Sequence, residues 1–141
     1  MATTRTANAH WEGSLMEGSG RVSLDSSNLG SYDVTWPSRT EQPEGRTSPE
    51  ELIAAAHSTC YSMALSHALA QAGSPPDRVD TRADVTFQPG QGITGIHLTV
   101  RASVPGMSAE DFSTHAEQAK DGCPVSQALK GTTITLDAAL S

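Results

Sequence analysis

Two cysteines are the residues of this chain with the most specific chemistry. Cys60 lies in a stretch from Leu52 to Pro76 that contains no Lys, Arg, Asp or Glu, so its thiol is expected to be buried. Cys123 stands directly before a proline that can begin a helix. In a reducing compartment, thiols are more often catalytic or metal-binding than structural. The pair therefore raises the question of redox chemistry.

Each cysteine also has an ordinary interpretation. A buried cysteine on an apolar helix most often packs as a small hydrophobic residue, and this applies to Cys60. A thiol at a helix N-terminus faces unpaired backbone N–H groups that favour the thiolate, but Cys123 is equally compatible with an unreactive surface thiol. Two charged residues that can assist a reactive thiol support a chemical role for both cysteines. Arg39 precedes the long helix, and Glu50 lies in its first turn.

Other kinds of chemical site lack the residues that they need. His57 and Cys60 have the i, i+3 spacing of joint metal ligands, but no Cys-x-x-Cys or paired-histidine motif supplies the remaining ligands. No serine stands in the Gly-x-Ser-x-Gly setting of a serine hydrolase. The glycines around Ser19 and Gln91 indicate turns and not phosphate-binding loops. Neither a metal nor a cofactor is expected.

The element that must position Cys60 is a long helix with clear ends. Ser48 is the expected N-cap, Pro49 suits the first helical position, and Glu51 completes a Ser-x-x-Glu capping box. The helix should end near residues 71–72, because Gly73 and the prolines after it cannot continue it. Beyond its first turn it carries no charge on any side, which is typical of a helix covered all round. A second subunit is the simplest cover.

The other elements follow from alternating polarity and from turn and cap residues. Short strands, a polar loop that carries Arg39, an antiparallel hairpin, two helices and a closing strand are predicted. In that order they cover residues 10–12, 21–24 and 32–36, the loop 37–47, the hairpin strands 79–87 and 96–104, a helix capped by Ser108 that ends near 121–122, a short helix after Cys123, and residues 132–136. This order predicts an α+β fold in a single domain over residues 1–141.

The charge and the apolar content exclude several classes of protein. The formal net charge of −7 argues against nucleic-acid binding and against docking on an anionic membrane. No N-terminal segment combines basic residues with an apolar run, so no secretion signal is expected. The longest uninterrupted apolar run in the charge-free segment covers only residues 52–56, far too short to cross a bilayer. A soluble, cytoplasmic protein is expected.

The two cysteine segments resemble the OsmC/Ohr family, the thiol peroxidases of bacteria. Residues 48–60 are similar to the central-helix signature of this family, and residues 119–129 are similar to its second-cysteine signature. Residues 10–13 resemble the opening strand of the OsmC branch. The two signatures together, in this order and about 60 residues apart, are specific, and the resemblance covers nearly the whole chain.

The resemblance implies a fold, an assembly and a set of site residues. The fold is OsmC-like, with antiparallel sheets packed on a long central helix, in an intertwined homodimer that has composite active sites. Cys60 is implied to be the peroxidatic cysteine and Cys123 the resolving cysteine. Arg39 and Glu50 are implied to be the arginine and the glutamate of the family site. Arg46 competes with Arg39 for this role, because both lie in the same variable loop.

The implied activity is the reduction of organic hydroperoxides, and also hydrogen peroxide, in the response to oxidative or osmotic stress. The Cys60 thiolate would attack the peroxide, become a sulfenic acid and condense with Cys123 to a disulfide. An external thiol, such as a dihydrolipoyl protein, must then reduce this disulfide. A buried thiol resists ionisation, so Arg39 would favour the thiolate, with Glu50 holding the guanidinium by a bidentate pair. Apolar residues near Cys60, such as Ile53 and Met63, favour an organic substrate.

Alternatives remain at this stage. The position of Cys123 at a helix cap favours it as the more acidic thiol, whereas the family assigns the attack to Cys60. A non-enzymatic dimer that binds a small apolar ligand would explain the uncharged helix, but it does not need Cys60, Cys123, Arg39 and Glu50 as a set. A structural zinc site or a thiol switch is the third interpretation.

Overall fold

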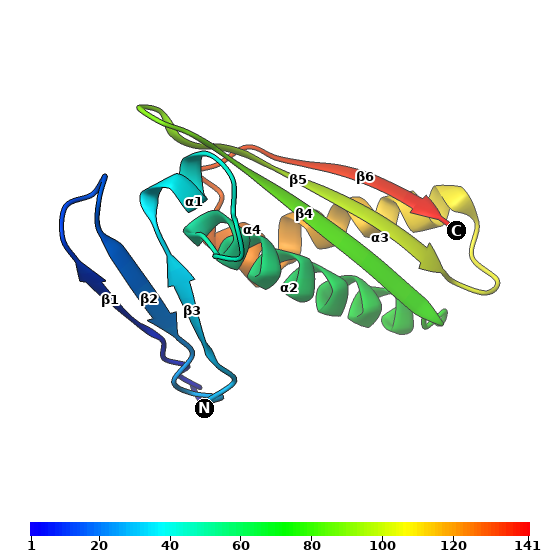
Figure 1. Ribbon diagram of the computed structural model, residues 1–141. Helices are drawn as coiled ribbons and strands as arrows, with labels where there is room; N and C mark the ends of the chain where they lie inside the picture. Colours follow the sequence, from blue (N-terminus) through cyan, green and yellow to red (C-terminus); the bar gives the residue numbers. More distant parts are fainter. The chain divides into compact units, whose positions relative to one another are not determined.

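The computed structural model describes residues 1–141, and its elements follow one another as drawn in Figure 1. By its internal contacts the chain divides into two compact units, residues 1–52 and residues 53–141. The long helix α2 (Pro49–Gln71) begins in the first unit and continues in the second. The predicted α+β class is confirmed: two small sheets accompany a central helix. No helix of the chain is long and apolar enough to cross a membrane.

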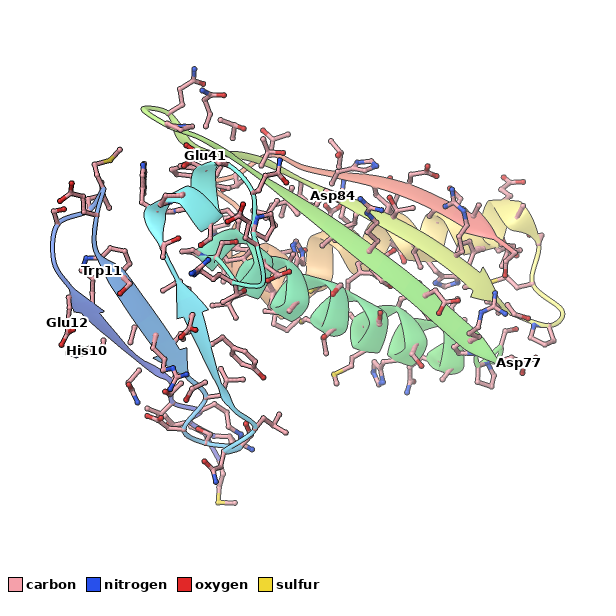
Figure 2. All side chains as sticks on the ribbon, in the orientation of Figure 1. His10, Trp11, Glu12, Glu41, Asp77 and Asp84 are labelled. Carbon is pink, nitrogen blue, oxygen red and sulfur yellow. The ribbon has the colours of Figure 1, made fainter.

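The first unit contains an antiparallel sheet of three strands in the order β1-β2-β3. These strands are β1 (Asn8–Glu12), β2 (Ser19–Ser23) and β3 (Ser31–Val34). Along β1 the side chains alternate, so Trp11 lies on one face while His10 and Glu12 lie on the other, where His10 Nε2 is 3.1 Å from Glu12 Oε1 (Figure 2).

Gly20 belongs to β2 and not to a turn, so the expectation of a turn at this glycine was wrong. It pairs with Trp11 across the sheet. A Cβ at this position would lie 2.6 Å from Trp11 Cε3 and 2.7 Å from the carbonyl oxygen of His10. Glycine is therefore required because the indole of Trp11 occupies the space that any side chain would fill.

A short helix, α1 (Trp36–Thr40), stands where a loop was predicted. Its N-cap is Thr35: Thr35 Oγ1 accepts a hydrogen bond from the backbone N–H of Ser38 at 3.1 Å, and Ser38 Oγ accepts one from the N–H of Thr35 at 3.0 Å. Pro37 in the first turn suits a helix start. The prediction failed because serine replaces the usual Glu or Gln of the capping box.

The long helix α2 has the predicted ends. Ser48 Oγ accepts a hydrogen bond from the N–H of Glu51 at 3.2 Å. The reciprocal half of the predicted capping box is not formed, because the Glu51 carboxylate instead accepts a hydrogen bond from Thr47 Oγ1 at 2.5 Å. Gly73 has φ +87°, in the left-handed region that other residues avoid, and the helix ends before it as predicted.

The second unit packs helices against a sheet with the order β4-β5-β6. The strands β4 (Arg78–Gln88) and β5 (Gly92–Ser103) form the predicted antiparallel hairpin, with an irregular register between Thr86 and Phe87. The last strand, β6 (Ile134–Leu140), begins later and runs further than predicted. It pairs parallel to β5, because α3 (Ala109–Gly122) and α4 (Pro124–Ala128) carry the chain back between the two strands (Figure 1).

The core of the second unit lies between this sheet and the helices α2 and α3. The buried side chains of β5 alternate as predicted and meet the buried faces of both helices. They are Ile96, Leu98, Val100 and Ala102 from β5, Tyr61, Leu65 and Leu69 from α2, and Phe112, Ala116 and Ala119 from α3. Cys123 belongs to the same core and is fully buried. The core thus holds α2 and the start of α4 in place, and these are the elements that carry the cysteines.

Candidate functional site

Arg39 and Glu50 form a bidentate ion pair in the first unit. Arg39 Nε donates to Glu50 Oε1 at 2.9 Å, and Arg39 Nη2 donates to Glu50 Oε2 at 2.8 Å. The Glu50 side chain is only 9% exposed and that of Arg39 is 28% exposed. The guanidinium also stacks near Trp36, with Arg39 Cζ 5.8 Å from the ring centroid. Such a pair fixes the plane and the orientation of the guanidinium.

Local structure explains why these two residues meet. Helix α1 places Arg39 in its last turn, and α2 places Glu50 in its first turn. The connection between the helices is closed by a parallel bridge between Val34 and Thr47 and by a hydrogen bond from Ser38 Oγ to the carbonyl oxygen of Thr47 at 3.2 Å. Arg46, the competing arginine, lies in this connection and is exposed.

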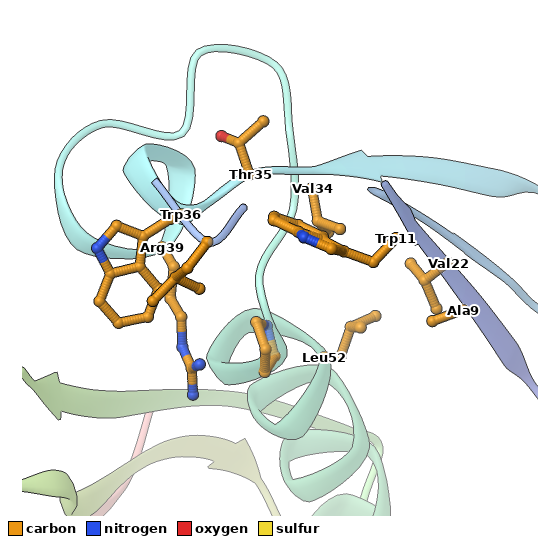
Figure 3. A pocket seen from close by; sticks show the side chains of 10 residues that line it. Ala9, Trp11, Val22, Val34, Thr35, Trp36, Arg39 and Leu52 are labelled. Carbon is orange, nitrogen blue, oxygen red and sulfur yellow. The ribbon is translucent and has the colours of Figure 1, made fainter. Parts of the chain in front are cut away.

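An apolar cavity of about 440 Å³ lies beside the ion pair within the first unit. Figure 3 shows Trp11 on one side of it and Trp36 with Arg39 on the other. The apolar side chains that complete its wall are Leu15, Val22, Val34 and Leu52. Sequence reasoning missed this cavity, although alternating apolar residues on three neighbouring strands were a signal for a shared face. A cation at the edge of an apolar cavity is suited to a ligand with one polar end.

Cys60 and Cys123 form a second pair, in the second unit, and both are free thiols. Cys123 is buried, whereas Cys60 packs against the core and is only partly buried, so the expectation of a buried Cys60 thiol was wrong. The Cys60 sulfur makes a hydrogen bond with the Cys123 side chain and accepts another from the backbone N–H of Val125. Burial is the main cause that raises the pKa of Cys60, and its hydrogen bond with Cys123 raises it further, whereas the Val125 N–H lowers it. The two thiols thus contact each other.

The N-terminus of α4 was expected to favour the Cys123 thiolate, but its backbone N–H contacts Cys60 instead. Cys123 is the N-cap of α4 as predicted, but its side chain makes no capping hydrogen bond. The Val125 N–H, in the first turn of α4, donates to Cys60 instead. An N–H donor stabilises a thiolate more than a thiol, so this contact offsets part of the rise that burial causes in the pKa of Cys60.

The four predicted site residues are therefore found as two contact pairs, one in each unit. Arg39 contacts Glu50 in the first unit, and Cys60 contacts Cys123 in the second. Of the residues expected to favour an organic substrate, Ile53 packs against the core, and Met63 is 68% exposed. No group of three His, Cys, Asp or Glu side chains is arranged to hold a metal ion.

A buried polar pair, not predicted from the sequence, lies next to the cysteines along the chain. His57 Nε2 is 2.7 Å from Ser126 Oγ, and both side chains are buried. His57 Nδ1 is buried without a hydrogen-bond partner. Burial lowers the pKa of His57, because the imidazolium is poorly solvated there. The sequence had offered His57 only as a metal ligand, since nothing in it links His57 to Ser126.

The lowered pKa of His57 predicts a pH dependence of stability. The unfolded chain binds a proton at His57 near pH 6.5, whereas the folded chain does not until a lower pH. Stability should therefore fall as the pH drops below about 6.5, by up to about 1.4 kcal/mol per pH unit for one proton. Urea unfolding of the reduced protein between pH 7.5 and 5 measures this slope. In His57→Gln the slope should be smaller by this contribution, and equal slopes would contradict the prediction.

A family model described as OsmC-like protein matches residues 42–137. The chain belongs to the OsmC-like family. The matched region contains Glu50, Cys60 and Cys123, whereas Arg39 and the first sheet precede it. The family membership inferred from the two cysteine segments is thereby confirmed.

Relatives of known sequence agree with this assignment to the OsmC-like family, and a solved structure shares the fold. Peroxiredoxin OsmC of Escherichia coli (strain K12) is 45% identical over 140 residues, which cover 97% of this chain and 96% of the relative. The organic hydroperoxide resistance protein of Xanthomonas axonopodis pv. citri is 31% identical over 99 residues, which cover 64% of this chain and 66% of the relative. A crystal structure of an organic hydroperoxide resistance protein OsmC from Legionella pneumophila has the same fold, with a TM-score of 0.70, 22% identity, and coverage of 100% and 98%.

Proposed function

We propose that this protein reduces organic hydroperoxides to alcohols, with Cys60 as the peroxidatic cysteine and Cys123 as the resolving cysteine. The names of its relatives place it among cysteine-based peroxidases that act in stress defence. The observation that carries the assignment of residues is the contact between two free thiols, one of which also accepts a backbone hydrogen bond. No inert packing role for the cysteines requires that contact.

The reaction proceeds in two steps on the enzyme. The Cys60 thiolate attacks one oxygen of the peroxide, the S–O bond forms while the O–O bond breaks, and the alkoxide leaves as the alcohol after protonation. The Cys123 sulfur then attacks the sulfenic sulfur, and water leaves as the disulfide forms. An external dithiol, for example a dihydrolipoyl protein, restores both thiols by exchange. A cytoplasmic location fits this cycle, because thiols are kept reduced there.

Arg39 supplies the cation that the partly buried Cys60 thiolate needs. A guanidinium held by Glu50 can stabilise both the thiolate and the charge that develops on the peroxide oxygens. Glu50 and Cys60 are ten residues apart on α2, about 15 Å along its axis, so the carboxylate itself does not reach the thiol. The long side chain of Arg39 or a second subunit must therefore bring the guanidinium to the Cys60 thiol. In this proposal each chain forms one OsmC-like domain over residues 1–141.

A homodimer is supported by an uncharged face of α2 that stays exposed in the single chain. This face consists of Ala55, Ala56, Thr59, Met63, His67 and Ala70. Met63 is 68% exposed, which is unusual for a large apolar side chain on a central helix. A second copy of the chain that covers this face would bury it and complete two composite sites.

The apolar cavity supports an organic hydroperoxide as the substrate. Removal of the indole in Trp11→Ala should raise the KM for cumene hydroperoxide about tenfold, since an apolar contact of about 1.4 kcal/mol is lost. The kinetics with hydrogen peroxide should stay within about twofold, because this substrate has no apolar part. Steady-state assays with both peroxides test the prediction. Equal losses for both substrates would show that the cavity does not bind the organic group.

The proposed function is tested by titration of the fully reduced protein with one equivalent of cumene hydroperoxide. Intact mass and free-thiol counts should show that both thiols are lost as two hydrogens leave each chain. Thiols that survive unchanged would contradict the proposal. They would favour a non-enzymatic protein that holds a small apolar ligand in the cavity beside Trp11 and Trp36.

A further inference from the structure

A buried hydrogen bond lies one helical turn from the cysteine pair. His57 precedes Cys60 by three residues on α2, and Ser126 follows Cys123 by three residues on α4. Both contacts connect the same two segments: His57 with Ser126, and Cys60 with Cys123. From His57 to Cys60 the chain advances three residues on α2, while their partners, Ser126 and Cys123, go back three residues along α4. Two antiparallel segments have this register. All four residues belong to the second unit.

We propose that His57 and Ser126 are positioning residues for disulfide formation. Their hydrogen bond holds α4 against α2, so that the Cys123 sulfur reaches the Cys60 sulfenic acid before a second peroxide molecule does. The proposal rests on the proposed peroxidase function. It adds that this hydrogen bond decides whether the Cys60 sulfenic acid forms the disulfide or is oxidised further.

The burial of this pair explains why it can hold the two segments together. The exposed fraction is 0% for His57 and 4% for Ser126, so neither side chain can exchange its partner for water. If the two segments separated locally, His57 Nε2 and Ser126 Oγ would be left without a partner in a dry environment. Burial also keeps His57 neutral by lowering its pKa, so the hydrogen bond joins two uncharged groups.

The contact between the Cys60 and Cys123 thiols cannot hold α4 against α2 throughout the catalytic cycle. Thiols form weak hydrogen bonds, and oxidation of Cys60 places an oxygen atom on the sulfur that contacts Cys123. The hydroxyl and the imidazole take no part in the redox chemistry. Their hydrogen bond therefore persists from the reduced state through the sulfenic acid to the disulfide.

The sulfenic acid has two competing fates. In the productive one, the Cys123 sulfur attacks the Cys60 sulfur, the S–S bond forms and the S–O bond breaks. The hydroxyl group leaves with the thiol proton as water. In the other, a second hydroperoxide gives one oxygen to the Cys60 sulfur as its O–O bond breaks. A second alcohol is released, and the resulting sulfinic acid is not reduced by thiols.

The test compares Ser126→Ala with a matched control, Ser62→Ala. Ser62 Oγ donates to Thr81 Oγ1 at 2.7 Å and so joins α2 to β4 by a hydrogen bond that does not involve α4. Stopped-flow oxidation by cumene hydroperoxide, dimedone trapping and intact mass separate the two steps. In S126A the first oxidation should stay within about twofold of wild type, and disulfide formation should slow at least about tenfold. Excess peroxide should then yield sulfinic acid, recognised by two added oxygen atoms.

In S62A both steps should match wild type, even where its melting temperature falls as much as that of S126A. Ser126→Thr, which restores a hydroxyl group, should recover disulfide formation. His57→Leu, which removes the partner of the Ser126 hydroxyl, repeats the test should S126A not fold. Wild-type rates of disulfide formation in S126A, or equal slowing in S126A and S62A, would overturn the inference. A wild-type protein that forms no disulfide would instead refute the peroxidase proposal, together with this inference.

Discussion

Replacement of Cys60 by serine should lower kcat/KM for cumene hydroperoxide at least about a thousandfold. A serine hydroxyl stays protonated at neutral pH and is a far weaker nucleophile than a thiolate, so the first step has no attacking group. In wild type the Cys60 sulfur accepts a hydrogen bond from the Val125 N–H, which a serine at this position can retain without gaining reactivity. Consumption of peroxide with a dithiol reductant, measured at several enzyme concentrations, gives the loss.

The control for this variant is Cys123→Ser. It keeps Cys60, so one equivalent of peroxide should still be consumed at a rate near that of wild type. The product should be a sulfenic acid that dimedone traps, because no resolving thiol is present. Comparable activity in Cys60→Ser and wild type, or normal disulfide formation in Cys123→Ser, would contradict the assigned roles.

Arg39→Met should slow the first oxidation about a hundredfold or more, the second largest effect expected. The guanidinium is the cation proposed to favour the thiolate and to stabilise charge on the peroxide oxygens. Its loss should also destabilise the fold, by about 3 kcal/mol, because the Glu50 carboxylate is only 9% exposed and would be left unpaired. Stopped-flow oxidation and urea unfolding measure the two effects separately.

Two further variants separate catalysis from stability. Arg39→Met combined with Glu50→Gln leaves no unpaired charge, so stability should largely recover while the oxidation rate stays low. Arg46→Met is the matched control, since Arg46 is exposed in the same connection and is not the partner of Glu50. A large loss of rate in Arg46→Met and none in Arg39→Met would transfer the role to Arg46.

The helices that carry much of the site could be predicted because their ends depend on residues close together in the sequence. The cap at Ser48 and the stop at Gly73 bounded α2, and Cys123 before Pro124 marked the start of α4. These signals depend on backbone hydrogen bonds and on φ preferences within a few residues, which act in the same way in almost any fold. The capping of α1 was equally local, but its Thr35–Ser38 pair departs from the usual residue types, and it was missed.

The contacts that the sequence did not predict join residues far apart along the chain. Val125 N–H donates to Cys60, His57 contacts Ser126, and β6 lies parallel to β5. Each depends on how α3 and α4 return across the sheet, and polarity patterns do not encode that path. The same holds for the apolar cavity of the first unit, which needs three strands and two helices to close.

The sequence by itself determined the family, the two candidate thiols and the helices that carry them, because these depend on short-range periodicity, caps and residue types. The tertiary structure decided which thiol receives the N–H at the start of α4, which arginine holds Glu50, and which buried pair lies beside the cysteines. The physical reason is that hydrogen bonds and burial are strong only where packing removes water, and packing depends on the whole chain.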